Sequence, residues 1–215
     1  MKESPRDASI HQPPVLAVVF DLGGVLIDWD PRHLYRSLFH GDDAAMETFL
    51  ATVCTPEWNR QQDTGRPWSE AVATLIAEHP EQHELIRAYW ERWPETLGDA
   101  IQPTVDVLAD VRASGVPIYA LSNWSAETFP AARPRYPFLE WFDGMVISGE
   151  VRVAKPDRRI YEALLERYEL EPGSIVFIDD VAENVDAARA LGIRSIRFTD
   201  GAALRRELIA LGVLV

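Results

Sequence analysis

The sequence predicts an α/β fold with a parallel sheet, into which a small all-helical segment is inserted. Two observations predict the sheet. Short, almost continuously apolar runs of strand length recur along the chain, and segments with helical spacing of apolar residues lie between them. A third observation predicts the insertion, because residues 31–97 contain no run with the character of a strand. A chain of 215 residues has room for one such domain and its insertion.

The predicted strands are short apolar runs that end in polar or turn-forming residues. Runs of this kind are typical of strands that are buried on both faces of a parallel sheet. They lie at residues 15–22 (VLAVVFDL), 116–121 (VPIYAL), 145–147 (MVI) and 174–178 (SIVFI). Residues 194–198 (RSIRF) form a more polar run, which we expect nearer to an edge of the sheet.

Helices are predicted between these strands at residues 104–113, 156–168, 182–191 and 202–211. Gly115, Gly192 and Gly212 follow three of them, and glycine commonly ends a helix. Strands that alternate with helices at this short spacing predict parallel pairing of the strands.

The inserted segment, residues 31–97, is rich in helix-forming residues. Prolines and Gly65 divide it into about four helices. We expect these helices to pack around the tryptophans of the segment and to join the rest of the chain, residues 15–30 and 98–215, through two hinge-like connectors. The tryptophans are Trp58, Trp68, Trp90 and Trp93.

Composition excludes several classes of protein. The formal net charge of −13 argues against a nucleic-acid binder, which would carry a basic face. Cys54 is the only cysteine, so an intramolecular disulfide and a cysteine-based zinc site are excluded, and a cytoplasmic location is expected. Residues 1–14 are polar and read as a flexible tail without an export signal. No apolar run approaches the roughly 20 residues of a membrane span. We expect a monomer or homodimer that binds a small molecule.

Polar groups follow the first two predicted strands. Asp21, with Gly23 and Gly24 after it, ends the first strand, and open parallel sheets bind ligands beyond such ends. The glycines permit a sharp turn and free amides that face an anion. Asp21 alone is equally well explained as a turn cap. Ser122 and Asn123 end the second strand and can donate to an oxyanion, although Ser-Asn is also common in turns.

Two further signals follow later strands. Lys155 is one of only two lysines in a chain with nineteen arginines, and a compact ammonium suits a site shared by a carboxylate and a phosphate. Asp179 and Asp180 are adjacent carboxylates, which are costly together unless a cation shares their charge. Oxygen ligands suit Mg²⁺, which is the expected cofactor. Either aspartate can also cap the helix that follows.

Taken in order, these residues resemble the motifs of the haloacid dehalogenase (HAD) superfamily, in the branch whose helical cap follows the first strand. The resemblance covers about residues 15–200, and the Asp-Leu-Gly of the first motif is most similar to bacterial sugar-phosphate phosphatases of the glucose-1-phosphate phosphatase type. It implies a Rossmann-like core with a small four-helix cap at residues 31–97. It also implies a Mg²⁺-dependent phosphomonoesterase that acts on a small phosphorylated metabolite such as a sugar phosphate.

The resemblance also implies roles for single residues. Asp21 would be the nucleophile that forms an aspartyl-phosphate. The Asp21 carboxylate, the Gly23 carbonyl and Asp180 would hold Mg²⁺, and Asp179 would act indirectly or through water.

For the phosphoryl group, the resemblance implies that Ser122 and Lys155 hold it and that Asn123 lies beside it. Backbone amides of residues 22–24, Gly24 included, would add donors. Substrate specificity is expected in the cap, where the polar stretch 58–63 and the turn 64–67 would face the mouth of the site. Arg60 would bind a second anionic group there, or would simply be a solvated helix end.

The sequence departs from the family pattern at Gly23, where most family phosphatases carry a second aspartate as general acid and base. Turnover is therefore expected to depend on the leaving group. The same absence keeps open a metal-independent 2-haloacid dehalogenase, in which Asp21 attacks carbon. A halide cradle would then come from Arg60, Trp58, Asn123 and Trp124. The acidic pair Asp179-Asp180 disfavours this alternative, and a member of the family without catalysis is the third possibility.

Overall fold

The centre of the computed structural model, which describes residues 13–215, is a five-stranded sheet. Its strands follow the order β5-β4-β1-β6-β7, and all neighbours pair in parallel. β1 lies in the middle and is buried along its whole length. The predicted α/β fold is confirmed, and so is the edge position of the polar run at residues 194–198. The strands are β1 (Ala17–Phe20), β4 (Ile118–Ser122), β5 (Gly144–Ile147), β6 (Ile175–Asp179) and β7 (Arg194–Arg197).

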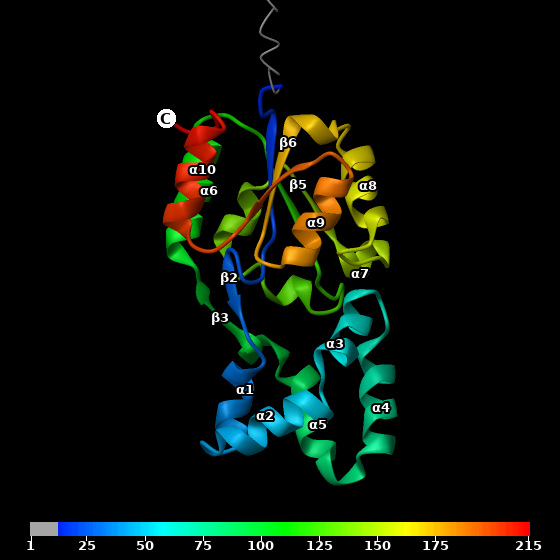
Figure 1. Cartoon of the computed structure of the whole chain (residues 1–215). Helices are drawn as coiled ribbons and strands as arrows, with labels where there is room; N and C mark the ends of the chain where they lie inside the picture. Colours follow the sequence, from blue (N-terminus) through cyan, green and yellow to red (C-terminus); the bar gives the residue numbers. More distant parts are fainter. Residues whose placement is uncertain (1–12) are drawn as a thin grey trace, which may run out of the picture.

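Helices cover both faces of the sheet (Figure 1). α6 (Gln102–Ala113) and α10 (Gly201–Ala210) lie on one face, and α8 (Arg158–Arg167) and α9 (Ala182–Ala190) lie on the other. The alternation of side chains along β1 serves both layers. Val18 and Phe20 belong to the hydrophobic cluster that contains Leu208 of α10, whereas Val19 packs in a second cluster with Ile160 of α8.

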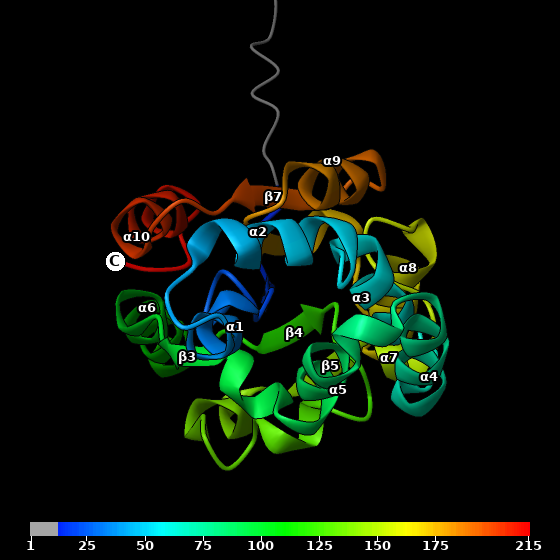
Figure 2. The same cartoon turned by 90° about the horizontal axis from the view of Figure 1, so that it is seen from below.

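A separate group of helices lies beyond the carboxyl ends of the strands (Figures 1 and 2). The segment holds five α-helices, so the expected number of four is wrong. The stretch before Pro56 is broken where His40 and Gly41 adopt positive φ angles of 51° and 87°, which a helix does not accommodate. The helices are α1 (Arg32–Leu38), α2 (Asp43–Thr52), α3 (Pro56–Asp63), α4 (Trp68–Glu78) and α5 (His83–Glu91).

The tryptophans of this segment behave only partly as expected. Trp58 and Trp68 pack edge to face, with their ring centroids 5.6 Å apart, and both contact Tyr89 of α5. Trp93 instead packs against Trp124, which follows β4, with the ring centroids 5.5 Å apart. The indole cluster therefore holds the helices together, and Trp93 ties them to the sheet.

The two connectors form a short antiparallel ribbon, in which β2 (Ile27–Trp29) pairs with β3 (Leu97–Ala100). The ribbon joins the helices α1–α5 to the sheet (Figure 1). The sequence predicted hinges here, because both connectors contain Pro or Gly together with Asp. Their pairing joins residues about 70 positions apart and leaves no local signal. The boundaries of the cap and core at residues 31 and 97 remain a prediction.

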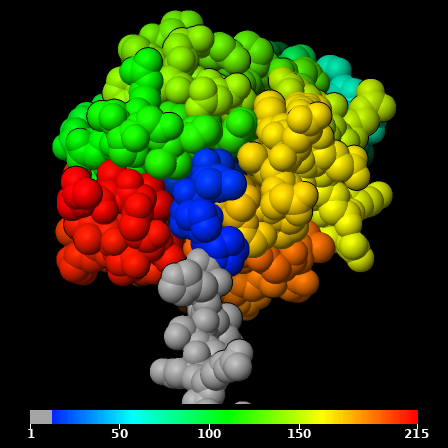
Figure 3. All heavy atoms as spheres, turned by 90° about the horizontal axis from the view of Figure 1, so that it is seen from above, coloured from blue at the N-terminus to red at the C-terminus, as the bar shows by residue number. Residues whose placement is uncertain are grey.

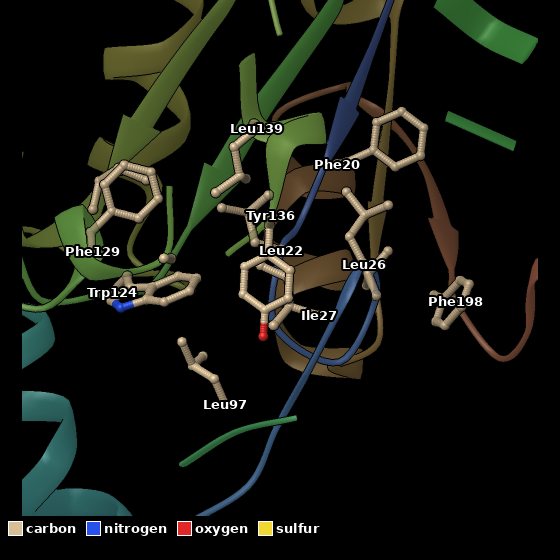
Figure 4. Close-up of a cluster of buried hydrophobic side chains, with 14 of the residues drawn as sticks. Phe20, Leu22, Leu26, Ile27, Leu97, Trp124, Phe129, Tyr136, Leu139 and Phe198 are labelled. Atoms are coloured by element: carbon tan, nitrogen blue, oxygen red, sulfur yellow. The ribbon is translucent and has the colours of Figure 1, made fainter. Parts of the chain in front are cut away.

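A hydrophobic cluster runs from the sheet to this ribbon (Figure 4). Phe20 of β1, Leu22, Ile27 of β2, Leu97 of β3 and Trp124 are among its members, and all are at most 5% exposed. The loops that follow β1 and β4 therefore rest on packed side chains, which keeps the polar groups on these loops in place.

The opposite end of the molecule holds the start of the described chain (Figure 3). The first described residues, drawn in blue, lie there between the C-terminal helix and the segment before β6, and the Leu16 N–H donates to the Ser174 carbonyl over 2.7 Å. Most of the predicted tail, residues 1–12, lies outside the described residues. Within residues 13–215, no helix is both long enough and apolar enough to cross a membrane.

Candidate active site

The polar groups at the strand ends meet in one cleft of about 400 Å³. The residues that follow β1, β4 and β6 form one side of it, and α3 faces them from the helical segment. Ligands of open parallel sheets bind in this position. Of the residues predicted for the site, Asp179 does not line the cleft, whereas the others do: Asp21, Gly23, Gly24, Arg60, Ser122, Asn123, Lys155 and Asp180.

Lys155 lies buried under the cleft with its ammonium between two carboxylates. Its Nζ is 2.9 Å from Asp21 Oδ1 and 2.7 Å from Asp179 Oδ2, and it also donates to the Leu121 carbonyl over 2.8 Å. Burial opposes the charged form of Lys155, but Asp21 and Asp179 outweigh this effect and raise its pKa. The ammonium is therefore a fixed positive charge at the ends of β1, β4 and β6.

Asp21 is nearly buried and carries the most perturbed carboxyl of this group. Burial raises its pKa from 3.8 to about 7, Lys155 opposes this rise, and Asp179 adds to it. The Leu22 N–H and Lys155 Nζ both contact Oδ1, at 2.7 and 2.9 Å. In the part of the chain that the structure describes, no hydrogen bond to Oδ2 is found, so Oδ2 is the oxygen that is free to react.

Asp179 holds other groups in place and does not face the cleft. It is fully buried. Its Oδ2 accepts from Lys155 Nζ and its Oδ1 from the Val181 N–H, and Asn184 Nδ2 donates to both oxygens, all at 2.7–3.0 Å. Asn184, in the first turn of α9, thus orients Asp179, and it also lines the cleft.

Asp21, Asp179 and Asp180 each place a carboxylate oxygen within 4.8 Å of the others. Burial and the charge of Asp179 raise the pKa of Asp180, as burial does for Asp21. Three carboxylates share one ammonium here, so the cluster carries more negative charge than Lys155 balances. Oxygen donors with an excess of negative charge fit a divalent cation such as Mg²⁺.

The two glycines after Asp21 differ in what they permit. Gly24 has a φ of 73°, and a methyl group on it would lie 2.6 Å from Asp180 Oδ2, so this position needs glycine. Its N–H donates to the Ile27 carbonyl over 2.9 Å. The expectation that the Gly24 amide faces a ligand is therefore wrong, because the turn into β2 uses it. Gly23 has no positive φ, and a methyl group on it would meet no atom within 4 Å.

Ser122 and Asn123 at the end of β4 have different surroundings. Ser122 is buried at the wall of the cleft. The side chain of Asn123 pairs with the backbone of Lys155: its Nδ2 donates to the Lys155 carbonyl over 2.9 Å, and its Oδ1 accepts from the Lys155 N–H over 2.8 Å. Asn123 therefore positions Lys155, and one of the two Nδ2 hydrogens stays available on the side of the cleft.

α3 brings two residues to the cleft that sequence reasoning did not single out, Asn59 and Asp63. Their spacing from Arg60 is the signal that could have found them, since positions 59, 60 and 63 lie on one side of a helix. The turn at residues 64–67 does not line the cleft, contrary to expectation. It packs on the core instead, where a methyl group on Gly65 would lie 3.1 Å from Arg152 Cγ.

The haloacid dehalogenase-like hydrolase family matches residues 15–192, which is most of the chain. The chain belongs to this hydrolase family. The match spans strands β1, β4, β5 and β6 of the sheet, the inserted helices and every residue of the cleft named above, so the resemblance expected from the motifs is confirmed.

Relatives within the HAD family have different activities. Sesquiterpene phosphatase astK of Aspergillus oryzae is 28% identical over 193 residues, covering 89% of this chain and 94% of the relative. A phosphorylated carbohydrates phosphatase of Thermotoga maritima is 27% identical over 213 residues, with coverage of 87% and 89%. (S)-2-haloacid dehalogenase 1 of a Pseudomonas species is 25% identical over 199 residues, with coverage of 86% and 84%.

Among solved structures, a HAD family enzyme from Bacteroides thetaiotaomicron in complex with magnesium and inorganic phosphate is similar to this chain. The TM-score is 0.67 and the identity 25%, over 87% of this chain and 96% of the other. The family thus includes phosphatases and a dehalogenase, and the residues of the cleft must decide between these reactions.

Proposed function

We propose that this hydrolase is a Mg²⁺-dependent phosphomonoesterase that acts on a small phosphorylated metabolite, of the sugar-phosphate type, through an aspartyl-phosphate on Asp21. The observation that carries the proposal is the cluster of Asp21, Asp179 and Asp180 around the single ammonium of Lys155. An excess of carboxylates calls for a cation, and a cation together with Lys155 makes the cleft attractive to a phosphate dianion.

Asp21 is the nucleophile in this proposal. Two donors hold Oδ1, which leaves Oδ2 to attack phosphorus as the bond from phosphorus to the alcohol oxygen breaks. Water then attacks the phosphorus of the acyl phosphate and releases inorganic phosphate, which restores the Asp21 carboxylate. The alcohol needs a proton as it leaves, and Gly23 has no side chain to supply it.

Lys155 and Ser122 hold the transferring phosphoryl group. The position of Lys155 does not depend on a ligand, because Asp179 holds its side chain and Asn123 holds its backbone. Fixed charges of this kind stabilise the charge that develops in the transition state without reorganisation.

Mg²⁺ would be held by the Asp21 carboxylate, the Gly23 carbonyl and Asp180, with Asp179 acting indirectly. When bound, it would neutralise the phosphate oxygens and favour attack at phosphorus. The similarity of this chain to a HAD enzyme solved with magnesium and phosphate supports this assignment of the metal ligands. A cytoplasmic location and a monomeric or dimeric state remain predictions from the sequence.

The alternative, a metal-independent 2-haloacid dehalogenase, draws on a relative with that activity and on the missing acid at Gly23. Of the residues expected for a halide cradle, Arg60, Asn123 and Trp124 line the cleft, but Trp58 does not. Trp58 packs among the helices, and Asn123 is paired with Lys155. Asp180 would also repel the carboxylate of a haloacid.

The decisive experiment measures phosphate release from p-nitrophenyl phosphate and from a panel of sugar phosphates, with Mg²⁺ and after treatment with EDTA. Chloride release from 2-chloropropionate is measured in parallel without metal. We expect phosphate release that needs Mg²⁺ and no chloride release. Metal-independent chloride release would replace the phosphatase assignment with the dehalogenase, and turnover of neither substrate class would favour a member without catalysis.

A further inference from the structure

The first residue of α4, Trp68, is bound to the loop that follows β4. Glu127 Oε1 accepts from the Trp68 N–H over 3.0 Å, and Ser125 Oγ accepts from Trp68 Nε1 over 3.1 Å. These two hydrogen bonds join residues that are 59 and 57 positions apart in the sequence. We call Trp68, Ser125 and Glu127 the α4 dock, because they attach the inserted helices to the loop that carries Ser122.

Glu127 completes the N-terminus of α4. The first N–H groups of a helix have no partner within it, and a side chain just before the helix commonly accepts from one of them. Pro67 precedes α4 and makes no such bond. Glu127 supplies the acceptor from a distant part of the chain, and its negative charge suits the positive end of the helix dipole. The N-terminus of α4 is therefore completed only while α4 lies against this loop.

Ser125 holds the side chain of the same residue. The Trp68 indole is fully buried and packs against Trp58 and Tyr89, so it belongs to the indole cluster of the inserted helices. Ser125 is only 3% exposed, and its bond to Trp68 Nε1 is buried. Loss of such a bond leaves a buried N–H without a partner, which costs stability. The indole cluster is thus held against the loop after β4.

The loop itself is pinned from the other side by α7 (Ser148–Val151). The Trp124 N–H donates to Ser148 Oγ over 2.9 Å, and the Gly149 N–H donates to the Trp124 carbonyl over 3.0 Å. A methyl group on Gly149 would overlap the backbone nitrogen of Ala126, so the loop and α7 are in close contact. α3 and α4 lie beside α7 in both views of the molecule (Figures 1 and 2). The loop is therefore a fixed support for the start of α4.

The α4 dock connects the two sides of the cleft. Ser122 lies on the strand side and directly precedes the loop, whereas Asp63 ends α3 on the opposite side, and both line the cleft. Burial raises the pKa of Asp63 from 3.8 to about 7, and a hydrogen bond from the Ser125 backbone opposes this rise. Ser125 thus reaches both the end of α3 and the start of α4. The distance across the cleft depends on this contact.

We propose that Ser125 and Glu127 are positioning residues, which hold α3 over the strand ends and so limit the size of the group that the substrate carries on its phosphate. This inference rests on the proposed phosphatase function. With the dock formed, the cleft has a volume of about 400 Å³. Without it, the ribbon and the contact of Trp93 with Trp124 still attach the inserted helices near β3, but the end of α3 can move away from Ser122.

The test compares two substrates that differ in size but release a similar phenol. One is phenyl phosphate, and the other is a pentapeptide of four glycines around a central phosphotyrosine, blocked at both ends. Because both leaving groups are phenols, their need for a proton is alike. We would measure kcat/KM for both with Mg²⁺, and kcat for p-nitrophenyl phosphate. We expect kcat/KM for phenyl phosphate to exceed that for the peptide by about 100-fold or more, because the peptide does not fit under α3.

Variants then assign the limit to the dock. Ser125→Ala and Glu127→Ala remove one acceptor each, and each should raise kcat/KM for the peptide relative to phenyl phosphate by about 10-fold or more. The kcat for p-nitrophenyl phosphate should stay close to that of the wild type, because Asp21 and Lys155 are held by other contacts. Glu127→Gln keeps an acceptor and should keep most of the limit. Glu166→Ala is the matched control, since Glu166 is an exposed residue of α8 outside the cleft.

A double-mutant cycle tests the hydrogen bond between Trp68 and Ser125. Trp68→Phe removes the indole N–H and keeps an aromatic ring in the indole cluster. If this bond holds α3 in place, Trp68→Phe combined with Ser125→Ala should change the ratio of the two esters no more than either substitution alone. Changes that multiply in the double variant would overturn the role of this bond.

The remaining outcomes separate the two proposals. Equal kcat/KM for phenyl phosphate and the peptide in the wild type overturns the size limit and leaves the phosphatase intact. Variants that lower both esters in proportion, or leave their ratio unchanged, overturn the positioning role of Ser125 and Glu127. Absence of Mg²⁺-dependent turnover of every ester, p-nitrophenyl phosphate included, overturns the phosphatase function and this inference with it.

Discussion

The two sides of the cleft differ in how their polar groups are paired. At the strand ends, Lys155 Nζ has three acceptors. Both carboxylate oxygens of Asp179 accept hydrogen bonds, and the Oδ1 and Nδ2 atoms of Asn123 are both hydrogen-bonded. On α3, across the cleft, Asn59 Oδ1 is a buried atom with no partner in the described ranges of the chain, residues 13–215. The groups placed for chemistry are thus held in position before a ligand arrives.

The largest effect is expected at the centre of the paired side. Asp21→Asn should lower kcat/KM for p-nitrophenyl phosphate by at least about 10⁴-fold, because an amide is a far poorer nucleophile. Stability should move the other way. The folded pKa of Asp21, about 7, lies above its ordinary 3.8, so the ionised carboxylate costs folding free energy at pH 8. We expect urea unfolding of the metal-free variant at pH 8 to show equal or higher stability. Retained turnover would refute the nucleophile.

The acidic pair gives the next contrast, between a group that faces the cleft and one that holds Lys155. Asp180→Asn should raise the Mg²⁺ concentration for half-maximal activity by about 10–100-fold and leave the free energy of unfolding unchanged or higher. Asp179→Asn should lower that free energy by about 2 kcal/mol or more, because it disrupts a buried, fully paired carboxylate. Titration with Mg²⁺ after EDTA treatment and urea unfolding measure the two effects. Equal stability losses in the two variants would contradict this division of roles.

The paired side of the cleft could be predicted from sequence because each residue follows a strand. Asp21, Ser122, Lys155 and Asp180 lie near the ends of apolar runs, and parallel strands bring such ends together. The pattern does not say how side chains pair once they meet. Asn123 hydrogen-bonds to the backbone of Lys155, and the Gly24 N–H donates to the Ile27 carbonyl. The first contact is long-range and the second depends on one turn, so no local pattern predicts either.

The side of the cleft formed by α3 was harder to predict. Asn59 and Asp63 come from a helix whose packing depends on the β2–β3 ribbon, and that ribbon pairs Ile27 with Ala100 across the whole inserted segment. Two strands of three and four residues leave too little pattern to distinguish them from a hinge. The helical spacing of residues 59, 60 and 63 was visible, but the direction in which that side points was not.

Gly23 lies on the paired side but has no side chain, and filling it tests whether a proton donor is missing there. Wild-type turnover should fall steeply as the leaving-group pKa rises. Gly23→Asp should raise kcat/KM for alkyl phosphates relative to aryl phosphates by about 10–100-fold. The backbone accepts the change, since φ is not positive and the Cβ position is open. Gly23→Asn, of the same size without an acidic proton, is the control. An equal gain in the asparagine variant would show that the effect is not proton transfer.

The smallest effect is expected at Asp63, on the α3 side of the cleft. There the pH dependence of the free energy of unfolding reports the environment of the carboxyl group. Its folded pKa of about 7 exceeds the unfolded 3.8, so the unfolded state loses its proton first as pH rises. The cost is absent below pH 3.8 and complete above pH 7. Asp63→Asn should therefore stabilise the protein, by about 1–3 kcal/mol more at pH 8 than at pH 5.

Asp157 is the matched control for Asp63, because its shift has the opposite sign. Hydrogen bonds from Arg159 lower the pKa of Asp157 to about 2, so its ionised form stabilises the fold above pH 3.8 and this contribution is lost as pH falls toward 2. Asp157→Asn should lower stability at pH 8, and only slightly because the pair is exposed. Urea unfolding of both variants across pH 5–8 makes the comparison. If Asp63→Asn showed no pH-dependent gain, Asp63 would be an ordinary solvated carboxylate, and the contrast between the two sides of the cleft would rest on Asn59 alone.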